Sequence, residues 1–174
     1  MVAYKPTGTT AHVSFNTSKM DRWETNGPPP KPHLNWVILD SEREGEFCCV
    51  AESHPSVKAY VKNHNLGLEV LYRYGSEMRH YRPDFVVLVD DGHKDEDLVH
   101  LIVETKSYRR EDAKAKKTTM DTYWVPGVNK LKQYGRWAFA EFTEVYQIEA
   151  DFAKKVEAEF NNRIEGLVLG GNTP

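Results

Sequence analysis

Two apolar segments joined by a short charged loop constrain the fold of this chain more than any other part of the sequence. The first segment, 81–90, reads YRPDFVVLVD, and the second, 98–106, reads LVHLIVETK. The loop between them, 91–97, has no apolar residues with which to build a core, so we predict an antiparallel hairpin. The second segment is apolar at nearly every position, which is typical of a strand buried on both faces in the middle of a sheet.

Ionisable side chains stand at one end of this predicted hairpin. Asp84 opens the first strand, and Glu104 and Lys106 close the second. Side chains alternate along a strand, so Glu104 and Lys106 share a face while Thr105 points to the other side. In an antiparallel hairpin the start of one strand lies beside the end of the other. We therefore expect Asp84 next to Glu104 and Lys106.

These residue types suit a metal site. Carboxylates are hard oxygen donors of the kind that hold Mg²⁺ or Mn²⁺, and the Thr105 carbonyl could supply a further ligand. A metal there could polarise a phosphodiester, and Lys106 could orient or deprotonate the attacking water. The alternative is a solvated salt bridge worth about 0–1 kcal/mol. The apolar strands, an acid on the preceding helix and the basic segment that follows favour the metal site.

The helix acid comes from a segment predicted as a helix over 41–52. Asp40 and Ser41 offer an N-cap, and Glu42, Glu44 and Glu46 lie in its first turns. These three acids fall on different faces of the helix. Phe47 follows Glu44 by three positions, so we favour Glu44 as the inward group, with Glu46 in reserve. Acids facing water at a helix N-terminus are the alternative.

The segment after Lys106 is basic and could grip a polyanion. Its candidate phosphate contacts are Arg109, Arg110, Lys114 and Lys117. A solvated helix face is the alternative reading of such a charge run. We expect the nearby aromatic side chains of Trp124, Tyr134 and Trp137 to belong to the core rather than to stack on bases.

The remaining segments complete a mixed α/β (α+β) pattern, with helices on both faces of a mixed sheet. We predict strands over 11–17, 34–39, 66–74, 78–89 and 136–142, and consider another over 145–148. We predict a short helix over 57–64, a helix from about 111 to 133 bent at Pro126, and a last helix from Asp151 to Ile164. The proline-rich segment 27–32 is expected to be an exposed connector.

Composition sets the broad class of the protein. The chain has 174 residues, 40% of them apolar and 28% charged, which is ordinary for one globular domain. It has no apolar run of the length that crosses a membrane and no N-terminal signal peptide. The adjacent cysteines, Cys48 and Cys49, are expected to be buried thiols, which fits a reducing cytoplasm. The net charge of −3 does not by itself indicate a nucleic-acid-binding protein.

The motif Pro83-Asp84 followed by Glu104-Thr105-Lys106 resembles that of the PD-(D/E)xK nucleases, with residues 85 to 103 between the acids. The surrounding sequence resembles the C-terminal endonuclease domain of type III restriction enzyme Res subunits over about residues 34–142. The segments that carry this resemblance are Asp40-Ser-Glu-Arg-Glu44, Val61-Lys-Asn63, Tyr81-Arg-Pro-Asp-Phe85, Val103-Glu-Thr-Lys106, Trp124-Val-Pro-Gly-Val-Asn129 and Tyr134-Gly-Arg-Trp137.

The resemblance implies a restriction-endonuclease-like fold and Mg²⁺-dependent cleavage of double-stranded DNA, with Mn²⁺ as a possible substitute. It implies Asp84 and Glu104 as metal ligands, Lys106 as the catalytic lysine and Glu44 as the helix acid. Family members carry a helicase-type ATPase in the same polypeptide and work with a DNA-methyltransferase subunit. The chain has no Gly-x-x-x-x-Gly-Lys-Ser/Thr phosphate loop, so ATP would act only through a helicase part. We therefore expect an N-terminal strand and proline-rich connector over 1–32 and an endonuclease domain over 33–174. The chain would be a domain excised from a longer helicase-nuclease chain, or a stand-alone relative of one.

Overall fold

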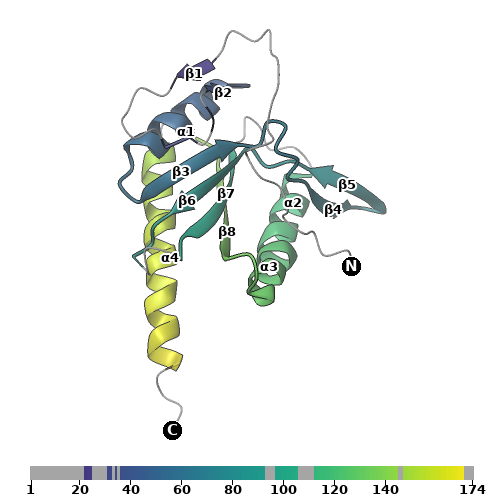
Figure 1. Ribbon diagram of the computed structural model, residues 1–174. Coiled ribbons are helices and arrows are strands. Elements are labelled where there is room, and N and C mark those ends of the chain that lie inside the picture. Colours follow the sequence, from purple (N-terminus) through teal and green to yellow (C-terminus); the bar gives the residue numbers. More distant parts are fainter. Residues whose placement is uncertain are drawn as a thin grey trace.

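The computed structural model of the protein describes residues 22–24, 31–32, 34, 36–92, 97–105, 112–144 and 147–170. Figure 1 shows a twisted central sheet with helices on both sides. The elements in chain order are β1 (Arg22–Glu24), β2 (Trp36–Ile38), α1 (Glu42–Ser53), β3 (Val57–Lys62), β4 (Val70–Tyr74), β5 (Glu77–Tyr81), β6 (Phe85–Val89), β7 (Val99–Thr105), α2 (Ala113–Thr119), the π-helix η2 (Met120–Trp124), α3 (Val125–Leu131), β8 (Arg136–Phe142) and α4 (Ile148–Gly170).

The central sheet has the strand order β3-β6-β7-β8. β6 pairs with β7 as the predicted antiparallel hairpin, with Phe85 opposite Val103 and Val89 opposite Val99. β8 runs parallel to β7 on the other side and is reached through α2, η2 and α3, since a parallel pair needs a long crossover. The apolar strand β7 therefore lies inside the sheet, as its sequence predicted.

One face of the sheet packs against α1 and α4 (Figure 1). An aromatic cluster forms the centre of this layer. The ring of Phe47 on α1 lies 4.9 Å from that of Phe85, 6.0 Å from Phe142 and 5.9 Å from Phe152 on α4. Burial of each such side chain contributes about 1.5–3 kcal/mol.

Helix α1 begins where expected, because the Ser41 hydroxyl accepts a hydrogen bond from Glu44 N at 3.3 Å.

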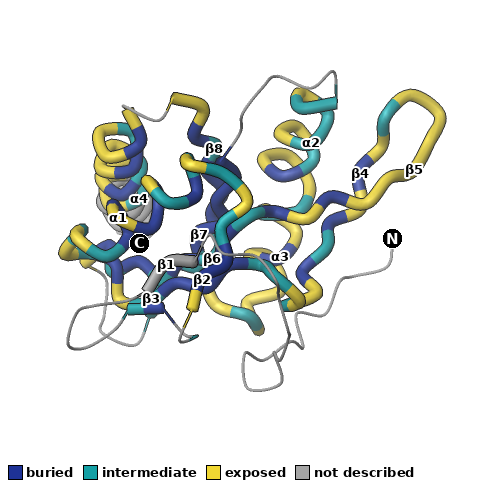
Figure 2. The backbone as a smooth tube through the Cα atoms, turned by 90° about the horizontal axis from the view of Figure 1, so that it is seen from above, coloured by how far each residue is buried: buried dark blue, intermediate teal, exposed yellow. Residues whose placement is uncertain are grey.

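The opposite face packs against the helical crossover and the β4–β5 hairpin. The hydrophobic core on this face, the second core, contains Tyr72 and Tyr81 from the hairpin, Ile102 from β7, Met120 from η2 and Phe139 from β8. Figure 2 shows buried residues concentrated along the sheet, while the tip of the β4–β5 hairpin projects from the body and is exposed. Helices on both faces of a mixed sheet confirm the predicted fold class.

The structure corrects the boundaries of several predicted elements. Residues 57–62 form strand β3 rather than a helix, because their apolar residues pair with β6 across the sheet. The predicted strand 78–89 is two strands in two sheets, since Pro83 interrupts it between β5 and β6. The last helix begins at Ile148 instead of Asp151 and ends at Gly170 instead of Ile164. Of the strand considered over 145–148, Ile148 is helical, and residues 145 and 146 lie outside the described residues. The helix predicted over about 111–133 with a bend at Pro126 is interrupted by the π-helical segment Met120–Trp124, which ends just before Pro126.

Two further expectations need correction. Cys48 is buried, but Cys49 is exposed on the outer side of α1, and both are free thiols. The end of the proline-rich segment is not an exposed connector, because Pro32 is buried and bridges to Tyr60 of β3. Its neighbour Lys31 donates through Nζ to the Ala51 and His54 carbonyls at the end of α1. The predicted strand 11–17 lies outside the described residues.

Candidate active site

Three strands of the central sheet and the start of α1 meet at one edge. The register places Lys62 of β3 opposite Phe85 of β6, and Phe85 opposite Val103 of β7. The residues just beyond these partners are Asn63, Asp84 and Glu104. Two of the predicted site acids, Asp84 and Glu104, therefore come to the same edge of the sheet from neighbouring strands.

The Asp84 carboxylate is held by the end of β7. Its Oδ2 accepts hydrogen bonds from the Thr105 backbone N at 2.6 Å and from the Thr105 Oγ1 at 2.8 Å. Among the described residues, no hydrogen bond reaches Oδ1 and no cation pairs with this carboxylate. Asp91, the buried acid at the opposite end of the sheet, instead pairs with Arg136 at 2.6 Å. Asp84 therefore does not form a simple salt bridge within the described part of the chain.

The Glu104 carboxylate is buried on the face of the sheet that carries the second core. The Tyr81 hydroxyl donates a hydrogen bond to Glu104 Oε2 at 2.8 Å. Burial, followed by the charge of Glu104, raises the pKa of Tyr81, and the charge of Asp84 raises it further. Tyr81 consequently stays a neutral donor close to both acids. Glu141 of the parallel strand β8 lies opposite Glu104 in the register.

Of the three acids at the start of α1, Glu44 is buried, whereas Glu42 and Glu46 are exposed. Glu44 Oε2 accepts from Asp40 N at 2.5 Å and from Lys62 Nζ at 2.7 Å. Lys62 is itself buried, with 7% of its surface exposed, and donates to the Ile38 carbonyl at 2.7 Å and to Asp40 Oδ2 at 2.6 Å. The helix acid is thus fixed by a buried cation that the sequence analysis had not singled out.

The charges of Glu44 and Lys62 both act on the pKa of the Asp84 carboxyl in the hairpin. Burial raises the pKa of the Asp84 carboxyl, and the charge of Glu44 raises it further. The hydrogen bonds from Thr105 and the charge of Lys62 act in the opposite direction. Asp84 therefore lies within electrostatic reach of Glu44 and Lys62 on one side and of Tyr81 on the other. A divalent cation at this position would remove the cost of burying its charge.

The predicted catalytic lysine, Lys106, and the predicted DNA contacts Arg109 and Arg110 lie outside the described residues. Lys114 and Lys117 are exposed on α2, and Lys117 pairs with Asp121. The indole rings of Trp124 and Trp137 are 5.3 Å apart and pack against the second core as partly buried side chains, in line with their prediction as core residues. Tyr134 is partly buried and belongs to neither described core, so its prediction as a core residue is wrong.

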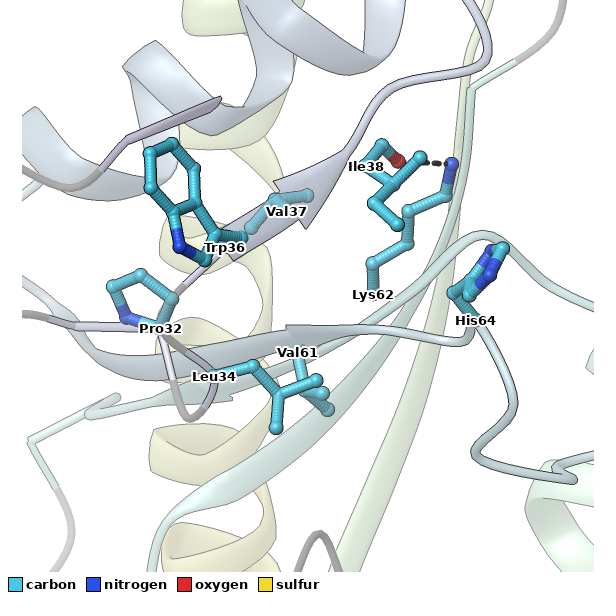
Figure 3. A pocket seen from close by; sticks show the side chains of 8 residues that line it. All are labelled: Pro32, Leu34, Trp36, Val37, Ile38, Val61, Lys62 and His64. Carbon is cyan, nitrogen blue, oxygen red and sulfur yellow. Dashed lines mark hydrogen bonds between the residues drawn. The ribbon is translucent and has the colours of Figure 1, made fainter. Parts of the chain in front are cut away.

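A small pocket lies behind the ion pair (Figure 3). Trp36 and Pro32 flank one end of it, while Lys62 and His64 lie at the other. The Lys62 side chain extends along this pocket to the Ile38 carbonyl. The pocket is lined mainly by apolar groups and does not contain the hairpin acids, so it is separate from the edge where Asp84 and Glu104 lie.

A protein-family model described as an endonuclease domain matches residues 31–124, more than half of the chain. The chain belongs to this endonuclease-domain family. Comparison with curated proteins and with solved structures gives no match. The matched range contains the hairpin acids, the helix acid and α2, and membership supports a restriction-endonuclease-like domain with nuclease activity.

The acids of this endonuclease domain fit a hard divalent cation that keeps much of its water shell. Mg²⁺ is commonly bound through one or two carboxylates, with water and phosphate oxygens completing the octahedron. Asp84 and Glu104 are two such groups, and the Thr105 carbonyl follows them at the end of β7. Across the described residues, no three side chains of His, Cys, Asp or Glu form a metal-binding group. The described residues would therefore offer such an ion one pair of carboxylates, those of Asp84 and Glu104.

Sequence reasoning missed Lys62, Asn63, Tyr81 and Glu141 as parts of this edge. The signal for the first three was present, because Val61-Lys-Asn63 and Tyr81-Arg-Pro-Asp-Phe85 were among the segments that resemble a nuclease family. For Lys62 and Asn63 it was hidden by the prediction of a helix over 57–64, since a helix gives no reason for Lys62 to be buried beside Glu44.

The described part of the endonuclease domain has no helix that is long and apolar enough to cross a membrane.

Proposed function

We propose that this endonuclease domain hydrolyses phosphodiester bonds of double-stranded DNA with Mg²⁺, or Mn²⁺ in its place. The observation that carries the proposal is the convergence of Asp84 and Glu104 at one edge of the sheet, from paired strands. Asp84 is fixed by Thr105, and Glu104 is fixed by Tyr81. Two oriented carboxylates brought to one edge of the sheet by paired strands make a site that a divalent ion would stabilise.

Asp84, Glu104 and the Thr105 carbonyl would hold the ion in this proposal. When bound, such an ion polarises a phosphoryl oxygen and stabilises the charge that develops on it. Lys106 would orient or deprotonate the attacking water, since the alternation of side chains along a strand predicts, from the sequence, that it shares a face with Glu104. Glu44 would act as the helix acid, with its charge balanced by Lys62 at 2.7 Å.

We further propose that the domain is the cleavage module of a type III restriction enzyme. The motifs shared with Res subunits support this role. ATP would then act through a helicase part of the same polypeptide, and a DNA-methyltransferase subunit would be the partner. Lys114 and Lys117 on exposed positions of α2, together with Arg109 and Arg110, would contact DNA phosphates. The free thiols of Cys48 and Cys49 support a cytoplasmic location.

Metal binding should depend on pH in a way that identifies Asp84. Because burial raises the pKa of this carboxyl, protons compete with the metal at a higher pH than for an ordinary aspartate. We expect Mn²⁺ affinity, measured by titration calorimetry, to weaken as the pH is lowered through the raised pKa of Asp84, by up to about tenfold per pH unit below that pKa. An affinity that stays constant until the pH reaches the range of an ordinary aspartate, about 3.9, would contradict the assignment of Asp84 as a ligand.

A DNA-binding or assembly module that retains the fold without catalysis is the second candidate. It is favoured by the hydrogen bond from Tyr81 that already occupies Glu104 Oε2. The two candidates differ in their use of metal. Salt-dependent DNA binding without Mn²⁺ uptake would support the binding module, whereas Mn²⁺ uptake with cleavage of supercoiled DNA, inhibited by EDTA, would support the nuclease.

A further inference from the structure

Asn63, the first residue after β3, makes hydrogen bonds to two separate segments. Its side-chain Nδ2 donates to the Pro83 carbonyl at 2.9 Å and to the Leu68 carbonyl at 2.8 Å. Its Oδ1 accepts from Leu68 N at 3.2 Å. Its backbone N donates to the Asp84 carbonyl at 2.7 Å. Both amide donors and the amide oxygen are therefore in use.

Together these bonds fix the backbone that carries the Asp84 carboxylate. Asn63 holds the carbonyls of Pro83 and Asp84, and Val103 accepts from the Asp84 N at 3.1 Å on the other side. Pro83 has a fixed φ and cannot donate, so its carbonyl is the only backbone polar group through which it can be held. With the peptide groups before and after Asp84 anchored, the carboxylate can meet the Thr105 N–H at 2.6 Å.

No other common side chain of this size makes the same set of contacts. Aspartate lacks the donors for the two carbonyls, serine cannot span both segments, and alanine keeps only the backbone N–H that donates to the Asp84 carbonyl. The Leu68 contacts also close the loop 64–69, in which Asn65 and Gly67 adopt left-handed conformations with φ of 58° and 78°. Loop closure and the anchoring of the Pro83 carbonyl, which precedes Asp84, consequently depend on a single side-chain amide.

We propose that Asn63 is a positioning residue that places the Asp84 carboxylate for metal binding. This inference rests on the proposed metal-dependent function and adds a residue outside the motif acids. Groups that orient a ligand without touching the metal typically change metal affinity or activity by about 10–100-fold when they are removed. Asn63 acts on Asp84 through the backbone, so its loss lowers the population of the carboxylate orientation that suits the ion.

Asn129 provides a matched control at the other end of β8. Its side chain makes the same kind of clamp, with Nδ2 donating to the Trp137 carbonyl at 2.9 Å and Oδ1 accepting from Trp137 N at 2.8 Å. The clamp is remote from the hairpin acids, since Trp137 lies opposite His100 in the register. Asn129→Ala therefore removes an equivalent structural contact without touching the Asp84 segment.

The test is carried out on the full chain with Mn²⁺ alone as the probe. We expect Asn63→Ala to weaken Mn²⁺ binding by about 10–100-fold in titration calorimetry, and Asn129→Ala to stay within about twofold of wild type. Asn63→Ser, which keeps an oxygen for Leu68 N, serves if the alanine variant does not fold. A second readout is the hydrogen exchange of the Thr105 amide, which should be faster in the Asn63 variants and unchanged in Asn129→Ala.

The outcomes separate this inference from the proposed function. If wild type binds Mn²⁺ and the Asn63 variants bind it equally well, the positioning role is overturned while the metal site stands. If wild type binds no Mn²⁺, the proposed metal dependence fails, and the Thr105 amide decides the role of Asn63. If the Thr105 amide of the Asn63 variants then exchanges at the same rate as in wild type, the positioning role of Asn63 is overturned.

Discussion

Asp84→Asn is expected to reduce Mg²⁺-dependent DNA cleavage by about 100-fold or more. The substitution removes the negative charge that would bind the ion, and an ion that stabilises a phosphoryl transition state contributes several kcal/mol. Cleavage of supercoiled plasmid by wild type and variant, at equal protein concentration and with EDTA controls, measures the effect.

The same substitution should leave the fold intact. The asparagine oxygen can still accept from the Thr105 N–H and hydroxyl, which now meet Asp84 Oδ2 at 2.6 and 2.8 Å. A carboxyl whose pKa is raised on folding is ionised at a cost once the pH exceeds that pKa, so a neutral amide removes this cost at pH 7. We therefore expect an unfolding temperature equal to or above that of wild type. Full cleavage activity in a folded Asp84→Asn protein would rule out the proposed site.

Lys62→Met is expected to destabilise the protein by about 3–5 kcal/mol. Lys62 and Glu44 form an ion pair at 2.7 Å with 8% and 6% of their side chains exposed, and removing one partner leaves the other charge buried and unneutralised. The Ile38 carbonyl also loses its donor. Denaturant unfolding, with the midpoint and slope compared between variant and wild type, gives the loss of stability.

Lys58→Met is the matched control, since Lys58 lies on the same strand and pairs with Asp90 at 3.0 Å with half of its side chain exposed. It should cost no more than about 1 kcal/mol. Adding Glu44→Leu to Lys62→Met should recover part of the stability, because the double variant has no buried unpaired charge. Equal losses for Lys62→Met and Lys58→Met would show that the Lys62 pair is not effectively buried.

The sequence predicts best those elements in which local pattern and tertiary role agree. The β6–β7 hairpin was predictable because the 91–97 loop has no apolar residues with which to build a core, whereas both flanking segments are apolar. Helix α1 was predictable from its Ser41 cap and the buried Phe47 face. The inward orientation of Glu44 followed from its spacing to Phe47, and the structure buries it. The catalytic roles of these acids stay predictions.

Other features depend on contacts between segments that are distant in the sequence. The apolar spacing of Val57, Tyr60 and Val61 suits a helix as well as a strand, and pairing with β6 decides for the strand. A lysine at a strand end normally reaches solvent, so only the folded chain shows Lys62 between Ile38 and Glu44. Similarly, the role of Tyr81 depends on a hairpin that turns its hydroxyl toward Glu104.

A crystal of the protein soaked in Mn²⁺ tests the central claim most directly, because the ion is located by its anomalous scattering. The proposed function predicts a peak bound by the carboxylates of Asp84 and Glu104 and by the Thr105 carbonyl, and no such peak in crystals of Asp84→Asn. Absence of a peak at this edge of the wild-type sheet, at a Mn²⁺ concentration that supports DNA cleavage, would contradict it.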